Sequence, residues 1–442
     1  MRIDQLTLKN FKGFEAKELT LNPEFNLIIG KNSTGKTSAL DALSIALGSW
    51  FLGIKGASTR HIRADEVMLK QFIANPSTDP DGEQAMPHWD QVFPCEITAH
   101  GEVQGQRVDW SRCLNSPSGR TTYREAQHVK TLSTDADNAV RKGKPVSLPL
   151  ISYYGTGRLW QEPRDFYQVD DPEEVASRRD SSRLSGYANS IEPRLSVKEL
   201  TRWIAQQSWI AFQQSGRAMP VFATVKEAMM ACVEGATELY FDARRGEVIV
   251  DIDGVVQPFS NLSDGQRCTL AMVGDMAQKA ARLNPQFGAE VLQNTPGVVL
   301  IDELDLHLHP RWQRRIIEDL RQTFPKIQFI CTTHSPFLIQ SLRSGEELLM
   351  LDGQPTAQVA NLPLEDIAQG IMGIPNPWVS LRYEEMRGAA KHYLEELEAA
   401  SKAPEEKLAD YKQRLAEAIA PYADNPAFQA FLEMKRAVKL GE

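Results

Sequence analysis

The chain has 442 residues, of which 42% are hydrophobic and 24% are charged, and this composition excludes a wholly disordered protein. Its formal net charge of −9 excludes a surface that binds nucleic acid everywhere, so such contacts would need a local basic patch or a partner protein. The first residues, MRIDQLTLKN, lack the apolar core of a signal peptide, and no apolar run is long enough to span a membrane. We therefore expect a cytoplasmic protein.

The 5 cysteines are scattered along the chain, and no two of them form a CxxC pair. An odd number without such pairs is not typical of a zinc site or of a disulfide framework. We expect them to be small buried side chains in a reducing compartment.

The first part of the chain predicts strands, then a helix, then a loop. Residues 3–8 alternate between apolar and polar, and residues 25–29 form a short apolar run. From Lys36 to about Leu52, apolar side chains recur at helical spacing, which predicts a helix with one buried face. Residues 55–90 are punctuated by Asn-Pro and Asp-Gly pairs and predict a loop.

The middle of the chain mixes strands and helices. Residues 91–113 predict two strands joined by a glycine-containing turn, residues 115–146 an exposed helix, and residues 148–154 a buried strand. Residues 197–214 carry apolar side chains at helical spacing, which predicts an amphipathic helix. Residues 237–259 predict a hairpin with glycine-containing turns.

From Ser260 onward, helices and strands alternate, which implies a largely parallel sheet. The last stretch, 380–442, is charge-rich and predicts helices over 382–400 and 405–420. The other expected elements are helices over 265–283, over 310–323 and from about Pro336, and strands over 297–301, 327–331 and 347–351.

The segment from Gly30 to Thr37 has the pattern G-x-x-x-x-G-K-[ST] between an apolar strand and a helix, as a phosphate-binding loop requires. Its glycines let the backbone curl, so that N–H groups and the positive end of the helix face phosphate oxygens. We expect Lys36 to reach the β- and γ-phosphates of ATP and Thr37 to bind Mg²⁺. The predicted nucleotide-binding residues of this segment are Gly30, Lys31, Asn32, Ser33, Thr34, Gly35, Lys36, Thr37 and Ser38. The alternative is a glycine-rich turn that binds nothing.

Asp302 and Glu303 directly follow the apolar run 297–301. Ligands of parallel sheets bind beyond the carboxyl ends of the strands, so both acids are predicted to lie beside the phosphate loop. We expect Asp302 to hold Mg²⁺ through water, and Glu303 to polarise the attacking water as a catalytic residue together with Lys36. The alternative, a solvated acidic loop, is disfavoured because the preceding residues are apolar.

The apolar run 327–331 leads into Thr-Thr-His-Ser-Pro, in which Ser335 can cap a helix and Pro336 suits its first turn. His334 is therefore predicted at a strand end beside the same pocket, as a catalytic residue that touches the γ-phosphate. A lone histidine is more often structural, but its position one strand after the acids favours the catalytic role.

Residues 261–267, NLSDGQR, resemble the LSGGQ signature of ABC ATPases, with Asp264 at the first glycine position. In that family the signature of one subunit closes over ATP held by the phosphate loop of another, so two heads sandwich the nucleotide. The resemblance implies that Ser263, Asp264, Gly265 and Gln266 bind the nucleotide of a second copy, where free N–H groups at a helix start form an anion site. The alternative is a capped helix start without a ligand.

Residues 10–14, NFKGF, resemble an element of RecF-like and SMC-type heads, which implies that Lys12 and an aromatic side chain lie near the nucleotide. The alternative for these aromatics is plain core packing. The pattern DE-x-D-x-H-L-H-P, which begins at Asp302, is similar to stand-alone RecF-like ATPases and differs from transporter domains. The Q-loop glutamine of the family has no match at the end of strand 148–154, and Gln161 lies beyond it. Arg158 and Arg63 are candidates to stabilise charge at the site, but we favour the alternative that each is a solvated surface arginine.

Together these resemblances imply an α/β fold, the ABC-type P-loop NTPase head: a mixed or parallel sheet flanked by helices, an antiparallel β subdomain, a helical lid insertion and a helical C-terminal tail. The insertion is too short for the coiled coil of an SMC protein. The expected divisions are residues 1–160, the N-terminal lobe with the phosphate loop; 161–234, the lid; 235–352, the C-terminal lobe with signature, acids and His motif; and 353–442, the helical tail.

The tail, with NPWVSLRYEEM at 376–386 and NPAFQAFLEM at 425–434, resembles the ATPase subunit of Septu anti-phage systems. The resemblance implies a homodimer or a higher oligomer of dimers that hydrolyses ATP slowly and regulates an HNH endonuclease partner, which the tail would dock. DNA would then be reached through the partner, and no membrane is involved. Two alternatives remain open: a RecF-like DNA-repair ATPase that binds DNA, and a scaffold that binds ATP with little turnover. For the tail, the alternative to a docking site is a helical hairpin that merely packs on the head.

Overall fold

The computed structural model spans the whole chain and divides it into two compact units, Met1–Ile367 and Ala368–Glu442. Each unit is described by itself. The residues that the structure describes are 1–72, 88–159, 182–214, 219–352, 362–402, 413–414, 416–418, 420–422 and 425–440.

The centre of the first unit is a five-stranded sheet in which every strand pair is parallel. Its central strands are apolar and buried, as a parallel sheet covered on both faces requires. The expected strands of the sheet are confirmed, and all of them end at the same edge. In spatial order the strands are β14 (Leu348–Met350), β3 (Phe25–Ile29), β13 (Ile327–Thr332), β12 (Gly297–Ile301) and β8 (Leu150–Tyr154).

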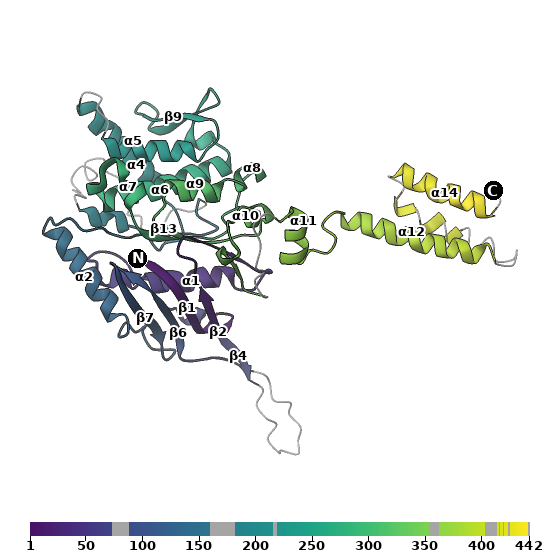
Figure 1. Ribbon diagram of the computed structural model, residues 1–442, viewed down its shortest axis with the longest axis horizontal. Helices are drawn as coiled ribbons and strands as arrows, with labels where there is room; N and C mark the ends of the chain where they lie inside the picture. Colours follow the sequence, from purple (N-terminus) through teal and green to yellow (C-terminus); the bar gives the residue numbers. More distant parts are fainter. Residues whose placement is uncertain are drawn as a thin grey trace, which may run out of the picture. The chain divides into compact units, whose positions relative to one another are not determined.

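One face of this sheet is covered by α1 (Lys36–Leu47), which packs between it and a four-stranded antiparallel sheet (Figure 1). Almost all of α1 is buried, because it is apolar on both sides. This second sheet is the expected antiparallel β subdomain. Its strands, in spatial order, are β2 (Phe14–Thr20), β1 (Arg2–Phe11), β6 (Cys95–Val103) and β7 (Gln106–Leu114), and α2 (Gln127–Arg141) packs on β7.

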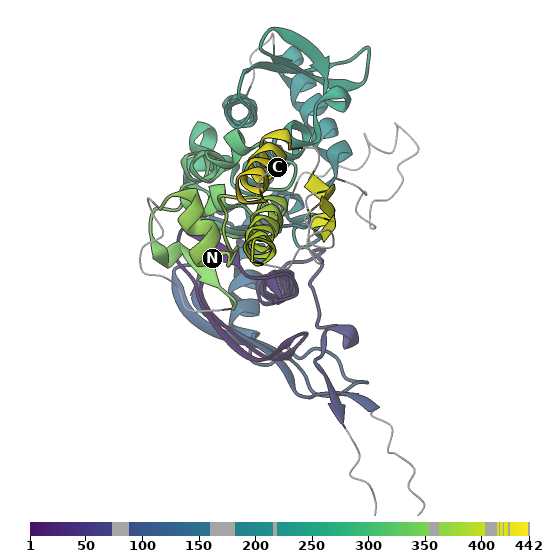
Figure 2. The same cartoon turned by 90° about the vertical axis from the view of Figure 1, so that its right-hand side faces the viewer.

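The other face of the parallel sheet is covered by a helical layer built around α6 (Asp264–Leu283), which packs on β8 (Figure 1). α4 (Val197–Gln213) and α5 (Pro220–Ala231) pack on α6 and also on a three-stranded antiparallel sheet. That sheet has the order β11 (Val255–Pro258), β10 (Glu247–Ile252), β9 (Ala236–Asp242), and Figure 2 shows it at the end of the unit opposite to the four-stranded sheet.

The structure differs from the expected elements at a few places. The first helix ends at Leu47, and a separate short helix, η1 (Trp50–Gly53), follows Gly48. The helix expected over 310–323 is broken into α8 (Pro310–Gln313) and α9 (Ile316–Thr323) by a turn over residues 314–315, where the N–H of Arg315 bonds to the carbonyl of Trp312 (3.1 Å). The stretch 55–90, expected to be loop, holds the arms of a hairpin, β4 (Leu69–Phe72) and β5 (His88–Gln91).

In the described part of the second unit, α12 (Leu381–Ala400) and α14 (Pro426–Leu440) pack on each other around Tyr393, Leu397 and Leu432. The helix expected over 405–420 lies largely outside the described residues. No helix among the described residues is long and apolar enough to cross a membrane. The remaining short elements are η2 (Ala64–Glu66), η3 (Arg183–Tyr187), η4 (Phe259–Asn261), η5 (Pro285–Glu290), α7 (Val291–Asn294), α10 (Pro336–Gln340), η6 (Gly345–Glu347), α11 (Leu364–Asp366), η7 (Ile367–Ile371) and η8 (Ala420–Tyr422).

Candidate functional site

The phosphate-loop pattern connects β3 to α1, as its flanking sequence predicts. Gly35 has φ 94°, and a Cβ atom there would lie 2.6 Å from the ring of Phe14, so this position accepts only glycine. Lys36 is 8% exposed, and its ammonium group donates to the carbonyls of Gly30 (2.7 Å) and Lys31 (3.2 Å). The lysine therefore folds back over the loop. Lys31, Asn32, Ser33 and Thr37 are exposed, while Thr34, Gly35 and Ser38 are half-buried.

The acidic pair after β12 lies beside this loop. Thr37 Oγ1 donates a hydrogen bond to Asp302 Oδ2 (2.9 Å), and Thr332 Oγ1 donates to Asp302 Oδ1 (2.6 Å). Asp302 is 2% exposed. Its carboxylate is therefore buried, and two hydroxyl groups fix its orientation. The two expected metal ligands, Thr37 and Asp302, are thus in direct contact, although they are far apart in the chain.

Glu303 adopts a left-handed backbone conformation with φ 48°, which is unusual for a residue other than glycine. Its N–H donates to Thr332 Oγ1 (2.8 Å). The same threonine therefore orients both acids. Strained backbone of this kind concentrates at functional sites, and here it turns the chain sharply at the end of β12.

The expectation that Arg158 is a solvated surface arginine is wrong. Its side chain is 2% exposed, and its guanidinium donates to the carbonyls of Asp302 (2.8 Å), Glu303 (3.1 Å) and Gly155 (3.1 Å). The carbonyls of Glu303 and Gly155 also accept the backbone N–H groups of Leu306 (3.0 Å) and Arg158 (3.2 Å), so the guanidinium gives these two a second donor and gives the carbonyl of Asp302 a donor beyond the end of β12. Arg63, in contrast, is exposed. Gln161 lies outside the described residues.

Asp305 joins the loop after the acids to the segment that contains His334. Its Oδ1 accepts from Thr333 Oγ1 (2.5 Å) and from the N–H of His334 (3.4 Å). Ser335 caps α10 through a hydrogen bond from the N–H of Phe337 (3.1 Å), as its position predicts. The imidazole of His334 is exposed at the carboxyl edge of the sheet.

One carboxylate of the site was not predicted from the sequence. Asp352 follows β14, and its Oδ2 accepts from the N–H of Lys31 at the start of the phosphate loop (3.1 Å). Burial lowers the pKa of Lys36, and the negative charges of Asp352, Asp302 and Glu303 act in the opposite direction. The rule that placed Asp302 at a strand end applies equally to Asp352, since β14 and β3 are parallel neighbours.

Lys12 lies in a group of charges on the flank of α1. Its ammonium pairs with Asp41 and lies 3.7 Å from Glu66, and Arg60 bonds to both of these acids at 2.7 Å. Burial alone would raise the pKa of Asp41, but the paired cations hold it below its usual value. The nearby Phe14 is the aromatic side chain that packs on the loop, so this element supports the loop from the side.

The signature-like segment begins α6, on the face of the parallel sheet opposite to α1 (Figure 1). Ser263 and Gln266 form a reciprocal capping box, and Asp264 pairs with Arg267 at 2.8 Å. A Cβ atom on Gly265 would lie 2.4 Å from the carbonyl oxygen of His307. The start of α6 therefore packs directly on the loop that follows the acids, while Ser263 and Asp264 remain exposed.

A parallel sheet with a phosphate loop, an acidic pair and a capped signature-like helix defines the class of ABC-type P-loop ATPases. Residues 25–340 match the family described as "AAA domain, putative AbiEii toxin, Type IV TA system", and the chain belongs to this family.

Named relatives agree with this assignment. The chain is 36% identical over 418 residues to the "Retron Ec83 probable ATPase" of Escherichia coli, a match that covers 80% of this chain and 72% of that protein. It is 30% identical over 393 residues to "Septu protein PtuA" of Bacillus thuringiensis, with 84% of each protein covered. The expected resemblance to Septu ATPases is confirmed, and the chain is an ATPase.

A solved structure, that of an Smc head bound to the C-winged helix domain of ScpA, matches 81% of this chain and 96% of that chain. The sequence identity is 16% and the TM-score is 0.45.

Proposed function

We propose that the site at the carboxyl edge of the parallel sheet binds and hydrolyses ATP. The observation that carries this proposal is the hydrogen bond between Thr37 and Asp302, which joins the phosphate loop to the acidic pair. The N–H groups of residues 30–38 and the start of α1 would hold the phosphates, and Lys36 would exchange its bonds to loop carbonyls for bonds to the β- and γ-phosphates.

The side chains that follow the strands would act on the γ-phosphate. Glu303 would polarise the attacking water and accept its proton, and His334 would bond to the phosphate oxygens. Thr332 supports both acids, and Asp305 fixes the backbone of His334. The catalytic set is therefore Lys36, Glu303 and His334.

The hydroxyl of Thr37 and the carboxylate of Asp302 are hard oxygen donors, and this donor set fits Mg²⁺. Bound there with ATP, the ion would supply positive charge that offsets the charge of the phosphates. Asp302 is held in place by Thr332, so the chain provides this position before any ion binds.

We propose further that two copies sandwich the nucleotide, so that residues 263–266 of one copy face the phosphate loop of the other. α1 and α6 lie on opposite faces of the sheet, and the exposed Ser263 and Asp264 leave the start of α6 accessible to a second copy. The N–H groups at the start of this helix can bind an anion, and in this arrangement the anion would be the phosphate of ATP held by the second copy. Lys12 would act from the side of the loop.

In this proposal the ATPase works in the cytoplasm in anti-phage defence, as a dimer or an oligomer of dimers that regulates an HNH endonuclease. The names of the retron and Septu relatives support the defence role. The second unit supports a docking role, because it exposes the apolar side chains of Trp378, Leu381 and Val438. DNA would be reached through the partner.

Two variants test the catalytic proposal. Lys36→Ala is expected to abolish ATP binding, and Glu303→Gln to retain binding while turnover falls by about a hundredfold or more. Binding is measured by calorimetry and turnover by phosphate release, with Lys142→Ala, at an exposed lysine, as the matched control. Unchanged ATP affinity in Lys36→Ala, or undiminished turnover in Glu303→Gln, would count against this site.

A further inference from the structure

A pocket of about 620 Å³ lies between the first half of α4, the three-stranded sheet and the start of α6. Its volume is typical of sites for small organic ligands. Its wall combines three cations with two aromatic rings: Lys198, Arg202, Arg267, Phe241 and Phe259. One carboxylate, Glu247, also lines it, with Arg245 at 3.9 Å from that group. The pocket is thus suited to a ligand with both negative charge and a flat apolar part.

Arg267 adds a specific reason to expect an acceptor in this pocket. Its Nη2 donates to Asp264 (2.8 Å), but its Nε atom is buried and has no hydrogen-bond partner among the described residues. A buried N–H group without an acceptor is unfavourable, and most such groups in proteins are satisfied. A phosphate oxygen in the pocket would satisfy it.

The pocket continues into an exposed stripe along α4. Lys198, Arg202 and Ala205 line the pocket, and Trp209 and Phe212 follow at the same helical spacing on the same face. These last two side chains are 60% and 72% exposed, and their rings stack on each other with centroids 5.7 Å apart. One face of a single helix therefore presents two cations and then two aromatic rings.

We propose that this face of α4 and the adjoining pocket bind single-stranded nucleic acid. The cations would contact successive phosphates, and the rings of Trp209 and Phe212 would stack on bases that a duplex keeps covered. The chain has a net charge of −9, so the cations of the pocket do not belong to a protein that is basic overall. Arg244 and Arg245 lie in the turn before β10, directly before the pocket residues Gly246 and Glu247 in the chain.

The observations favour a strand over a free nucleotide or a duplex. A free nucleotide would fill the pocket but leave the exposed ring pair without a role. A duplex offers phosphates but no exposed base faces, so it would use the cations alone. The pocket and the stripe together fit several linked nucleotides.

The test is fluorescence anisotropy with the full chain and a fluorescein-labelled 20-nucleotide oligo(dT), an oligo(U) of the same length and a 20-base-pair duplex. We expect oligo(dT) and oligo(U) to bind with similar affinity, because ring faces and phosphates do not distinguish the sugar, and the duplex to bind at least about tenfold more weakly. Trp209→Ala is expected to weaken binding by about tenfold. Lys198→Ala is expected to reduce the magnitude of the slope of log K against the logarithm of the salt concentration by about 0.7, where K is the association constant.

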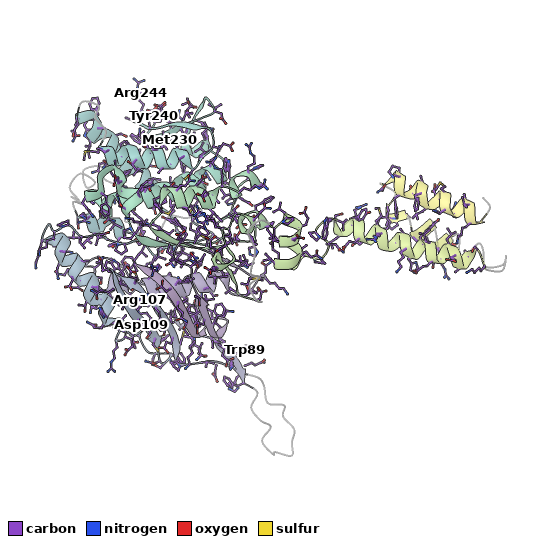
Figure 3. All side chains as sticks on the ribbon, viewed as in Figure 1. Trp89, Arg107, Asp109, Met230, Tyr240 and Arg244 are labelled. Carbon is purple, nitrogen blue, oxygen red and sulfur yellow. The ribbon has the colours of Figure 1, made fainter. Side chains whose placement is uncertain are left out.

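Arg107→Ala is the matched control, because Arg107 is an exposed arginine on β7 of the four-stranded sheet (Figure 3). Its affinity for oligo(dT) should equal that of the unmodified chain. No binding of oligo(dT) at low salt, equal loss in Arg107→Ala and Lys198→Ala, or equal binding of the duplex would overturn the proposal. If dTMP displaces the oligonucleotide and binds with the same affinity, the proposal is overturned, and the ligand of the pocket is a free nucleotide.

The pocket wall includes Ser260 and Arg267, on either side of the segment 263–266. If a strand binds there, ATP turnover is expected to rise, an effect that depends on the proposed ATPase function of the site. Lys36→Ala separates the two ideas, since that variant should still bind oligo(dT) while it loses ATP binding. If the wild-type chain binds ATP but does not bind the oligonucleotide, only the proposed nucleic-acid site is refuted.

Discussion

At the residue scale, the site depends on hydroxyl groups that hold carboxylates. Thr37 and Thr332 contact the two oxygens of Asp302, and Thr332 also accepts the N–H of Glu303. Asp302 and Glu303 follow β12, Thr332 ends β13, and Thr37 lies at the start of α1. The parallel sheet therefore assembles the site, because it brings these ends to one edge.

Arg158 allows a stability prediction. Replacing it by alanine removes the guanidinium donor from the carbonyls of Asp302, Glu303 and Gly155, of which the last two keep a backbone N–H donor. Arg158→Ala is therefore expected to lower the free energy of unfolding by about 3 kcal/mol. Urea denaturation measures this quantity. Arg63→Ala is the matched control at an exposed arginine and should change it by less than about 0.5 kcal/mol. Equal effects of the two substitutions would contradict the bonded role of Arg158.

Asp352 allows an affinity prediction. Asp352→Asn can keep an acceptor for the N–H of Lys31 but removes a negative charge beside the phosphate loop. Because that charge repels triphosphate, the variant is expected to bind ATP about threefold to tenfold more tightly at low salt, and less so at high salt. Calorimetry at two salt concentrations measures the difference. Weaker binding would instead indicate that the carboxylate is needed to shape the loop.

At the element scale, the start of α6 and the loop after the acids are in backbone contact. Gly265→Ala places a Cβ atom 2.4 Å from the carbonyl of His307, so the start of α6 must move. ATP turnover is expected to fall by about tenfold or more, while ATP binding to the monomer stays within about twofold, because the atoms nearest to a Cβ on Gly265 belong to His307 and Trp312 and not to the phosphate loop. Phosphate release and calorimetry measure these two quantities.

Gly388→Ala is the control for this prediction, since a Cβ atom there has nothing within 4 Å. Its turnover should match that of the unmodified chain. A Gly265→Ala variant with full turnover would show that the contact between α6 and the loop is not needed for hydrolysis.

Most elements of the sheet could be predicted from the sequence, because strands and helices with strong apolar patterns form wherever they can be covered. The break at Arg315 could not, since residues on both sides favour a helix. The burial of Arg158 was missed because its local sequence, Gly-Thr-Gly-Arg, is typical of an exposed turn. Its carbonyl partners come from another strand, and local sequence carries no signal for such contacts.

The site residues also divide into those that a local sequence pattern predicts and those that depend on tertiary contacts. The phosphate loop and the acids have local patterns, and the structure brings them together. The contacts of Lys12 with Asp41 and Glu66 depend on tertiary packing, so the sequence did not indicate them. The four expected divisions of the chain, and the roles of 263–266 and His334, stay predictions.

At the scale of the whole molecule, the two compact units allow a truncation prediction. A chain that ends at Ile367 retains the first unit, and with it the parallel sheet and the phosphate loop. It is expected to bind ATP within about threefold of the full chain but to lose co-purification with a partner nuclease. Calorimetry and affinity capture measure these properties. Loss of ATP binding in a folded truncated chain would contradict the independence of the first unit.

The central claim is that one complete site takes its phosphate loop from one copy and residues 263–266 from another. Lys36→Ala and Ser263→Arg chains should each be inactive alone. On mixing, about half of the dimers are mixed and each holds one intact composite site, so about a quarter of the wild-type ATP turnover should return. If both segments of a site belonged to the same chain, the mixture would stay inactive, and that result would contradict the account.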